Sequence, residues 1–406
     1  MRYVALALVA LNLPAQNFEQ RGFLDLRFTG YADSAVGDSG RAVTEALFRY
    51  EPSYTISPEL RLAASFDART DSHRQVQREW GLSWQDREIQ RPAFEVRRLS
   101  AIYHRGRVTA ELGKQFVRWG KADLLNPTDR FAPRDFLSVV DNDFLAVTAA
   151  RVTCEASSRD AIEFVIVPWF TPSRIPLLKQ RWVVLPPEVQ RAPLEDAGAR
   201  LPGGSQYGVR WNHVDSRFEH SLSFYEGFNH LPMIDGWLAP APMRIALQRF
   251  YPQMRMYGGD AAIPLRWFTV KAETAYFTSK SPLADEYMQY VVQVQRQTGE
   301  LNLVAGYAGE LVTEDRGGAG FAPDRGLART FLGRAEYTID INRSVAFEGV
   351  VRRDGDGAWL KFEYSQAFGR HFRATASFTV IRGALEDFLG QYRRNSFVTL
   401  SLRYSL

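Results

Sequence analysis

The sequence has a single cysteine and, after its first residues, no long apolar run. Because Cys154 stands alone among 406 residues, an intramolecular disulfide is impossible and a cysteine-rich metal site is excluded. A membrane-spanning helix needs about 18 or more apolar residues in succession, and the body of the chain has no such run. Helical membrane spans are therefore excluded.

The sequence also has no large excess of positive or negative charge. The 50 Lys and Arg residues are scattered among 46 Asp and Glu residues, which leaves a net charge of +4. A basic stripe of the kind that binds nucleic acid is missing, so we expect no nucleic-acid partner.

Known catalytic patterns are missing as well. The sequence contains no Gly-x-Ser-x-Gly, no His-Glu-x-x-His and no glycine-rich phosphate loop. His213 and His220 flank a short turn, where they could in principle bind a metal, but this spacing is not diagnostic. We expect a protein that is not an enzyme and that holds neither a cofactor nor a metal.

The amino-terminal segment is typical of a cleavable signal peptide. Met1-Arg2 supplies a short positive start, residues 3–11 are apolar, and Leu13-Pro14-Ala15 places a small residue before Gln16. The alternative is an ordinary buried strand or short helix. We expect residues 1–15 to direct export and to be removed, and residues 16–406 to form one domain.

The dominant period of the remaining chain is two. In residues 60–69 the even positions are apolar and the odd positions mainly polar, and residues 372–380 and 398–406 repeat this pattern. Strand side chains alternate between two faces, so each segment predicts a strand with one apolar and one polar face. Such strands form either a soluble sandwich, with the apolar face inward, or a membrane barrel, with the apolar face toward lipid.

The connections favour the barrel. We predict about 18 strands, at residues 22–31, 43–54, 60–70, 93–104, 107–117, 144–154, 160–170, 206–214, 217–227, 252–262, 267–278, 286–297, 301–312, 329–340, 344–353, 358–367, 371–382 and 396–406. The connections between them are alternately short and long. A transmembrane barrel has tight turns at one end and long loops at the other, which predicts an all-β, antiparallel, up-and-down transmembrane β-barrel. Merging or dropping one hairpin would give about 16 strands.

The last strand and the aromatic residues fit this fold. Leu402, Tyr404 and Leu406 alternate with polar residues up to the last position. This pattern resembles the terminal targeting strand of outer-membrane proteins, although that strand usually ends in Phe. Aromatic residues near predicted strand ends suggest the interface girdles of a barrel; they are Tyr54, Tyr103, Trp169, Trp267, Tyr276, Trp359, Phe368 and Tyr404.

A distinct string of residues follows the predicted strand at 107–117. Gly113-Lys114-Gln115 precedes Trp119-Gly120-Lys121, and Asn126-Pro127-Thr128-Asp129 comes next. Over about 25 residues this string resembles the loop of poorly characterised, porin-like outer-membrane barrel families. The resemblance implies a passive or substrate-selective channel in the bacterial outer membrane, and it names no substrate.

The same segment has the turn-forming pairs Asn126-Pro127 and Ala132-Pro133. We hypothesise that it folds into the lumen and narrows it; the alternative is a solvated outer loop. The charged residues of this constriction would be Arg118, Lys121, Asp123, Asp129, Arg130, Arg134 and Asp135. Its basic residues can pair with its own acids and with Asp141 and Asp143.

The polar faces of the predicted strands would line the lumen. The residues expected there include Arg61, Arg69, Lys271, Glu273, Arg334, Glu336, Lys361, Glu363, Arg373 and Arg403. Over the whole polar face the signs nearly match, which predicts cross-strand ion pairs of about 0.2–1 kcal/mol each. A ring of one sign, which would select ions, is not indicated.

In this interpretation the partners are outer-membrane lipid, lipopolysaccharide, the barrel-insertion machinery and a small hydrophilic or amphiphilic solute, and a homo-oligomer would be in keeping with porins. A second interpretation is a non-conducting barrel that acts as an adhesin, an assembly factor or a docking scaffold. Apolar groups in loops 171–205 and 228–251 would form a partner surface, a gate for a hydrophobic ligand, or contacts between loops. An outer-membrane hydrolase is the least favoured function.

Overall fold

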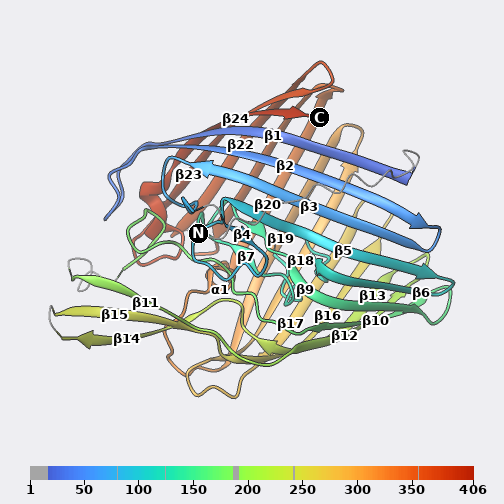
Figure 1. Ribbon diagram of the computed structural model, residues 1–406, viewed down its shortest axis with the longest axis horizontal. Coiled ribbons are helices and arrows are strands. Elements are labelled where there is room, and N and C mark those ends of the chain that lie inside the picture. Colours follow the sequence, from blue (N-terminus) through green and yellow to red (C-terminus); the bar gives the residue numbers. More distant parts are fainter. Residues whose placement is uncertain (1–16, 80, 124, 186–191, 241–242, 355) are drawn as a thin grey trace, which may run out of the picture.

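The computed structural model describes residues 17–79, 81–123, 125–185, 192–240, 243–354 and 356–406. The predicted signal peptide lies outside these ranges. Eighteen antiparallel strands form one closed barrel (Figure 1). They are β1 (Phe18–Tyr31), β2 (Ala42–Ser57), β3 (Leu60–Asp71), β5 (Phe94–Arg105), β6 (Val108–Gln115), β9 (Val147–Glu155), β10 (Asp160–Val167), β12 (Gln206–Val214), β13 (Glu219–Phe228), β16 (Gln253–Pro264), β17 (Thr269–Thr278), β18 (Glu286–Thr298), β19 (Leu301–Glu314), β20 (Thr330–Asp340), β21 (Arg343–Arg352), β22 (Gly357–Phe368), β23 (Phe372–Gly383) and β24 (Phe397–Ser405).

The barrel closes between its first and last strands. β1 pairs with β24 from Phe23 opposite Ser405 to Tyr31 opposite Phe397. Each remaining barrel strand pairs with its neighbours along the chain. The prediction of an all-β barrel of 18 strands is confirmed, and the alternative with 16 strands is wrong.

The connections alternate in length as predicted. The tight turns at one end span residues 58–59, 106–107, 156–159, 215–218, 265–268, 299–300, 341–342 and 369–371. The connections at the other end span residues 32–41, 72–93, 116–146, 168–205, 229–252, 279–285, 315–329, 353–356 and 384–396.

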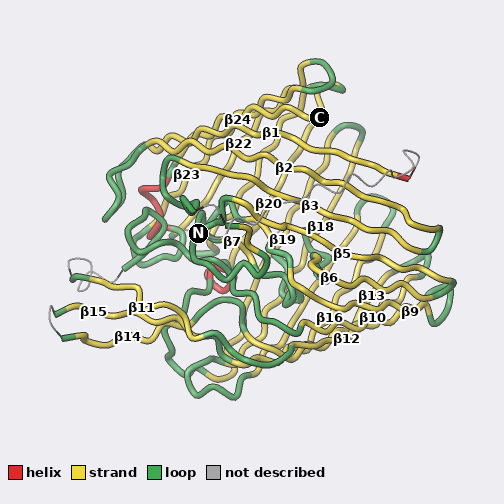
Figure 2. Tube along the Cα trace, viewed as in Figure 1, coloured by secondary structure: helices red, strands yellow, loops and turns green. Residues whose placement is uncertain are grey.

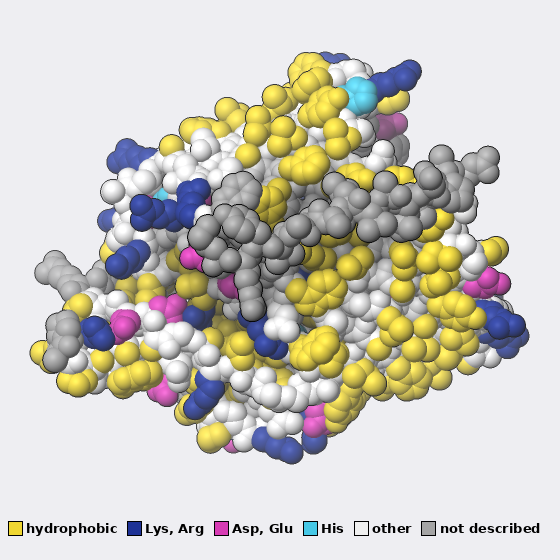
Figure 3. Space-filling view, in the orientation of Figure 1, with side chains coloured by type: hydrophobic (Ala, Val, Ile, Leu, Met, Phe, Trp, Pro, Cys, Tyr) yellow, Lys and Arg dark blue, Asp and Glu magenta, His cyan; other side chains and the backbone are white. Residues whose placement is uncertain are grey.

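The alternation of side chains gives the barrel an apolar outer face. On β3, Leu62 and Phe66 are 39% and 38% exposed, whereas Ser65 and Asp67 are each 3% exposed and face the interior. Hydrophobic side chains gather over the strands at the right of Figure 3, and charged side chains lie mainly near the edges of that view. A closed sheet satisfies its own backbone N–H and C=O groups, which a lipid environment requires.

No helix among the described residues is long and apolar enough to cross a membrane. The long connections do contain short elements that were not predicted (Figure 2). A separate three-stranded sheet projects from the barrel and consists of β11 (Leu194–Arg200), β15 (Arg244–Phe250) and β14 (Met233–Ala239). The others are β4 (Leu82–Ser83), the pair β7 (Arg134–Asp135) and β8 (Asp143–Phe144), α1 (Pro323–Gly326) and the 3-10 helix η2 (Gly390–Asn395).

Much of the buried apolar core lies inside the barrel, where connections fill the lumen. Trp119 and Phe131 of the β6–β9 connection pack with Tyr225, Met256 and Phe277 of the inner wall. The inner face of the wall is therefore apolar wherever a connection touches it. On β16, Met256 faces inward beneath the loop while Tyr257 is exposed on the outer face, so apolar and aromatic side chains lie on both faces of this strand.

One predicted interface aromatic is placed differently. Trp359, which was expected in the outer girdle, is 8% exposed and faces the interior. It belongs to a second apolar cluster near the long-connection end, together with Leu389, Tyr392 and Phe397. The prediction for Trp359 is wrong because an aromatic residue near a strand end can pack on an inward-folded connection as well as face lipid.

Candidate functional site

The β6–β9 connection, residues 116–146, enters the barrel and is anchored on one wall carboxylate. Glu273 on β17 accepts hydrogen bonds from the backbone N–H groups of Lys121 (2.9 Å), Ala122 (3.0 Å) and Thr128 (2.8 Å). The hydroxyl of Thr128 donates to the same carboxylate at 2.8 Å. Hydrogen bonds to an ionised acceptor are about twice as strong as neutral ones. Glu273 therefore holds the start of this segment against the wall.

The residues of the Trp-Gly and Asn-Pro-x-Asp string meet in one turn. Asp129 Oδ1 accepts the backbone N–H groups of Trp119 (2.6 Å) and Gly120 (2.7 Å). A Cβ atom on Gly120 would lie 2.4 Å from Cβ of Asn126, so this position has no room for a side chain. The Asn126 side chain donates to the carbonyl of Ala122. These contacts give Trp119, Gly120, Asn126 and Asp129 structural roles in the turn.

The predicted constriction charges form few contacts with one another. Arg118 pairs with Asp129 inside the segment at 3.4 Å. Lys121 instead reaches Glu219 on β13 at 2.8 Å and Asp260 on β16 at 3.5 Å. The remaining pairs to wall or other connections are Asp123–Lys271 (2.9 Å), Arg130–Asp324 (3.7 Å), Asp141–Arg27 (3.2 Å) and Asp143–Arg97 (2.9 Å). Among the described residues, the prediction of pairing within the segment is therefore wrong except for Arg118 and Asp129.

Asp135 belongs to a buried chain of charges that ties three connections together. Arg174 bridges Asp135 (3.2 Å) and Asp86 (2.9 Å); Asp135 also contacts Arg91 at 2.8 Å, and Asp86 contacts Lys114 at 2.5 Å. Burial alone would raise the pKa of Asp135. The guanidinium groups of Arg91 and Arg174 outweigh this effect and hold the pKa well below its usual value.

Part of the β10–β12 connection also enters the barrel mouth. Trp182 is 1% exposed, and its ring lies 5.7 Å from that of Tyr392 and 6.4 Å from that of Phe397. Arg181 lies 3.6 Å from the ring centroid of Tyr31 and exchanges hydrogen bonds with Asn395. The apolar groups of residues 171–205 could form a partner surface, a gate for a hydrophobic ligand or contacts between loops. Trp182 forms contacts between loops.

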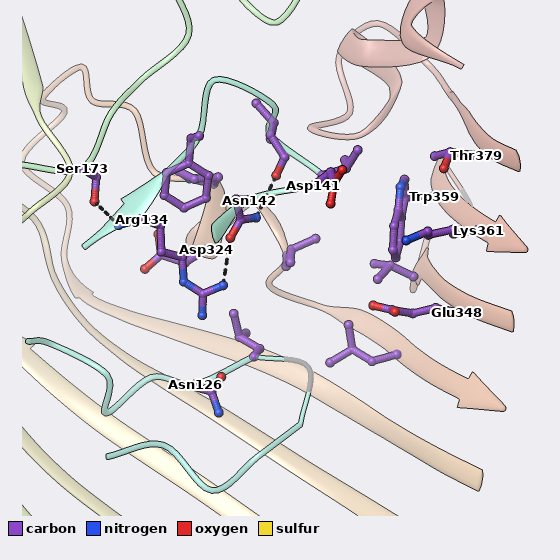
Figure 4. A pocket seen from close by; sticks show the side chains of 18 of the residues that line it. Asn126, Arg134, Asp141, Asn142, Ser173, Asp324, Glu348, Trp359, Lys361 and Thr379 are labelled. Atoms are coloured by element: carbon purple, nitrogen blue, oxygen red, sulfur yellow. Dashed lines mark hydrogen bonds between the residues drawn. The ribbon is translucent and has the colours of Figure 1, made fainter. Parts of the chain in front are cut away.

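A cavity of about 590 Å³ lies between the β6–β9 segment and the inner wall made by β20–β24 and β1 (Figure 4). The charged residues that line it are Arg27, Arg130, Arg134, Arg334, Lys361, Arg373, Arg403, Asp123, Asp129, Asp141, Asp324, Glu348 and Glu363. Four predicted constriction residues thus reach the cavity: Asp123, Asp129, Arg130 and Arg134. Arg118, Lys121 and Asp135 are not among the residues that line it.

The inner wall changes character along its height. Leu332, Val350 and Trp359 lie side by side in register and form an apolar row near the long connections. The next row toward the short turns alternates in sign across neighbouring strands and consists of Arg334, Glu348 and Lys361. A solute that enters from the long-connection end would meet the apolar row first.

The other residues predicted to face the lumen vary in their surroundings. Arg69 pairs with Asp67 at 2.5 Å and with Glu95 at 3.3 Å beneath the connections, and Arg61 pairs with Glu19 at 3.0 Å while half exposed. Like Arg69–Asp67, the pairs Arg334–Glu336 (3.0 Å) and Lys361–Glu363 (3.1 Å) form along one strand rather than across two. Arg373 Nη1 donates to Ser365 Oγ at 3.0 Å, and Arg403 pairs with Asp25 at 3.0 Å.

Several solved structures share this arrangement. The chain resembles OccAB3 and OccAB4 from Acinetobacter baumannii, with TM-scores of 0.53 and 0.54 and sequence identities of 8% and 10%. The matches cover 96% of this chain and 99% and 98% of those chains. A BenF-like porin from Pseudomonas fluorescens Pf-5 gives a TM-score of 0.54 at 7% identity, over 96% of this chain and 98% of that one. The fold is that of a porin. Searches against family models and curated proteins returned no match.

Within this porin fold the histidines contribute no recognisable metal centre. Among the described residues, no three His, Cys, Asp or Glu side chains are grouped so that they could hold a metal ion. His213 and His220 lie beside a short turn with their rings 5.1 Å apart, and His213 Nδ1 lies 2.8 Å from Asp160.

Proposed function

We propose that the chain is an outer-membrane channel through which small hydrophilic or amphiphilic solutes diffuse without energy input. The observation that carries this proposal is the cavity between the inward-folded β6–β9 segment and the inner wall. Its lining combines charged, hydroxyl and apolar side chains, which suits a water-filled passage for small solutes. The apolar outer face and the closed sheet fit a barrel with lipid outside and water inside.

The β6–β9 segment is the proposed constriction. Glu273 and Lys271 anchor it to β17 and Glu219 anchors it to β13, so it stays in the lumen rather than over the mouth. The cavity is lined by seven cationic and six anionic side chains, and a wall of mixed sign does not select strongly between simple ions. The width that the segment leaves, rather than one ring of charge, would set which solutes pass.

Single-channel conductance in planar bilayers tests both parts of the proposal. We expect the folded protein to give discrete conductance steps, and deletion of residues 121–135 to raise the conductance because it removes the constriction. Replacing Trp237 and Leu238 of the projecting sheet by Ser is the control and should leave the conductance unchanged. A barrel with heat-modifiable mobility that gives no steps would overturn the channel; steps unaffected by the deletion would overturn the constriction.

The same proposal places the protein in the bacterial outer membrane, with lipid against the apolar face and lipopolysaccharide beside the long connections. Leu402 and Tyr404 are exposed on the outer face of β24, and the N–H of Leu406 donates to the carbonyl of Gly22 at 2.9 Å. An apolar closing strand of this kind supports recognition by the barrel-insertion machinery. Exchanging Tyr404 for Asp should reduce the amount of folded barrel in outer-membrane fractions.

A docking scaffold is the second candidate function, and the projecting β11–β15–β14 sheet favours it. Trp237, Leu238 and Met243 at the outer part of this sheet are 44%, 70% and 75% exposed. Large apolar side chains exposed together are a common feature of partner surfaces. The absence of conductance from a correctly folded barrel would leave docking as the better explanation.

A further inference from the structure

Three arginines of the β6–β9 segment lie close together and face two carboxylates. Arg118 pairs with Asp129 at 3.4 Å, and Arg130 lies 3.7 Å from Asp324. Among the described residues no carboxylate oxygen lies within 4.0 Å of Arg134. Three positive and two negative charges leave one positive charge without a partner, and Arg134 carries it.

Arg134 is held firmly despite this lack of a carboxylate. Its backbone N–H donates to Ser173 Oγ at 3.0 Å, its Nη1 donates to Asn142 Oδ1 at 3.0 Å, and its guanidinium lies 4.1 Å from the ring centroid of Phe144. Figure 4 shows the guanidinium directed into the cavity, on the side opposite Trp359 and Lys361. The side chain is thus fixed before any solute arrives.

The surroundings of Arg134 favour an anion. Burial lowers the pKa of Arg134, and the positive charges of Arg118 and Arg130 lower it further against the opposing effect of Asp129 and Asp324. A partly buried cation without a counter-ion is unfavourable, and an incoming anion would reduce that penalty. A guanidinium also binds carboxylate or sulfonate oxygens in a two-point geometry.

The opposite wall offers a different surface. Trp359 continues the apolar row of Leu332 and Val350 and lines the cavity. Trp359 Nε1 and Thr379 Oγ1 are both buried, and no described residue forms a hydrogen bond with either atom. The cavity therefore combines an uncompensated cation on the segment with an apolar surface and unused polar groups on the wall.

We propose that the cavity binds an organic monoanion with an apolar body, with the anionic group at Arg134 and the apolar part against Trp359, Val350 and Leu332. This rests on the proposed channel function and names, among the solutes that the width of the constriction admits, the class that the cavity binds. A single uncompensated charge matches a monoanion, such as an aryl-substituted carboxylate or sulfonate. A neutral analogue of the same shape would leave Arg134 unpaired, and a small anion would leave the apolar row in contact with water.

Calorimetric titration of the folded barrel in detergent tests the proposal without relying on conductance. We expect 3-phenylpropanoate to bind at least about tenfold more tightly than 3-phenylpropanamide or propanoate, since a charge-assisted hydrogen bond is worth about tenfold or more in affinity. Arg134→Gln should weaken the binding of 3-phenylpropanoate by at least about tenfold, and Arg134→Lys should weaken it less. Equal binding of the acid and the amide would overturn the proposal.

Arg97→Gln is the matched control. Arg97 also lies over a phenyl ring, that of Phe116 at 4.9 Å, but it pairs with Asp143 at 2.9 Å and is not among the residues that line the cavity. Arg97→Gln removes the same charge as Arg134→Gln, but the variant should keep its affinity for 3-phenylpropanoate. An equal loss in both variants would show that the net charge alone attracts the anion and would overturn the site at Arg134.

The two proposals fail separately. Conductance steps that 3-phenylpropanoate does not block, together with no calorimetric binding, would overturn the anion site and leave the channel in place. Binding to a barrel that never conducts would overturn the channel and leave the site. If Arg134→Gln does not fold, as judged by heat-modifiable mobility, the comparison of acid and amide on the unaltered protein still decides.

Discussion

Ion pairs are buried on one side of the lumen and exposed to water on the other. Beneath the connections, the side chains of Lys114, Asp86 and Arg174 are 1%, 0% and 1% exposed. On the open wall, Arg334 and Glu336 form a pair at 3.0 Å but remain 44% and 40% exposed. Removing one partner of a buried pair leaves the other charge without compensation, whereas water replaces the partner of an exposed charge. The contribution of an ion pair to the stability of this barrel therefore depends on whether a connection covers the pair.

The largest effect should come from breaking the covered network. Arg174→Met leaves both Asp86 and Asp135 without their bridging cation, so we expect a loss of about 3–5 kcal/mol in unfolding free energy. Urea unfolding of the barrel in detergent micelles, followed by tryptophan fluorescence, measures it.

Arg334→Met on the open wall makes the same replacement and provides the contrast. Because Arg334 is nearly half exposed, its loss should change the unfolding free energy by about 1 kcal/mol or less. Similar changes in unfolding free energy for Arg174→Met and Arg334→Met would show that cover by the connections does not strengthen an ion pair.

A smaller effect should follow the protonation of His230 in the β13–β14 connection. Its ring stacks on Phe170 at 5.2 Å and its Nδ1 lies 2.5 Å from the carbonyl of Thr171, and burial lowers its pKa from 6.5 to about 4. When the connection is detached from the barrel, the imidazole of His230 binds a proton near pH 6.5. When the connection is packed, the imidazole stays neutral at that pH. The packed state is therefore fully favoured above pH 6.5 and loses up to about 3 kcal/mol as the pH falls toward 4.

Limited proteolysis of residues 229–252 at about pH 7 and about pH 4.5 measures this change. Cleavage should be faster at the lower pH. His230→Gln should remove most of the difference, and an undiminished difference in that variant would assign the titration to another group.

A further, smaller effect is expected at the anchor of the constriction. Glu273→Gln keeps the size of the side chain but places an NH₂ group against one of two sets of donors, either the N–H groups of Lys121 and Ala122 or the N–H and hydroxyl groups of Thr128, so we expect a penalty of about 1–3 kcal/mol. Faster proteolysis between residues 117 and 131 and noisier conductance would show it. Glu336→Gln on the open wall should change neither quantity.

The sequence was sufficient for the barrel but not for its interior. Period-two segments such as β3, β23 and β24 place apolar and polar residues on opposite faces, and the length of the connections then excludes a sandwich. The string from Trp119 to Asp129 could be recognised as a folded turn from its own residues. Its anchor Glu273 lies 152 residues after Lys121, and no local pattern links the two.

The inner apolar surfaces were missed for a related reason. Met256 and Trp359 face inward because connections and apolar neighbours occupy that part of the lumen. Which connection packs there depends on contacts between distant segments. An apolar residue on the otherwise polar face of a strand was the available signal, and by itself it does not show which connection packs there.

The turn around Glu273 has a mechanical consequence. Through Glu163, Glu219, Asp260, Glu273 and Gln293 it is bonded to strands β10, β13, β16, β17 and β18. A wide cylinder of single-layer sheet can flatten into an ellipse with little change in its backbone hydrogen bonds. A segment bonded to five strands on one side of the barrel resists that flattening. The cross-section on this side should therefore keep its shape, while the strands that no connection covers should flex.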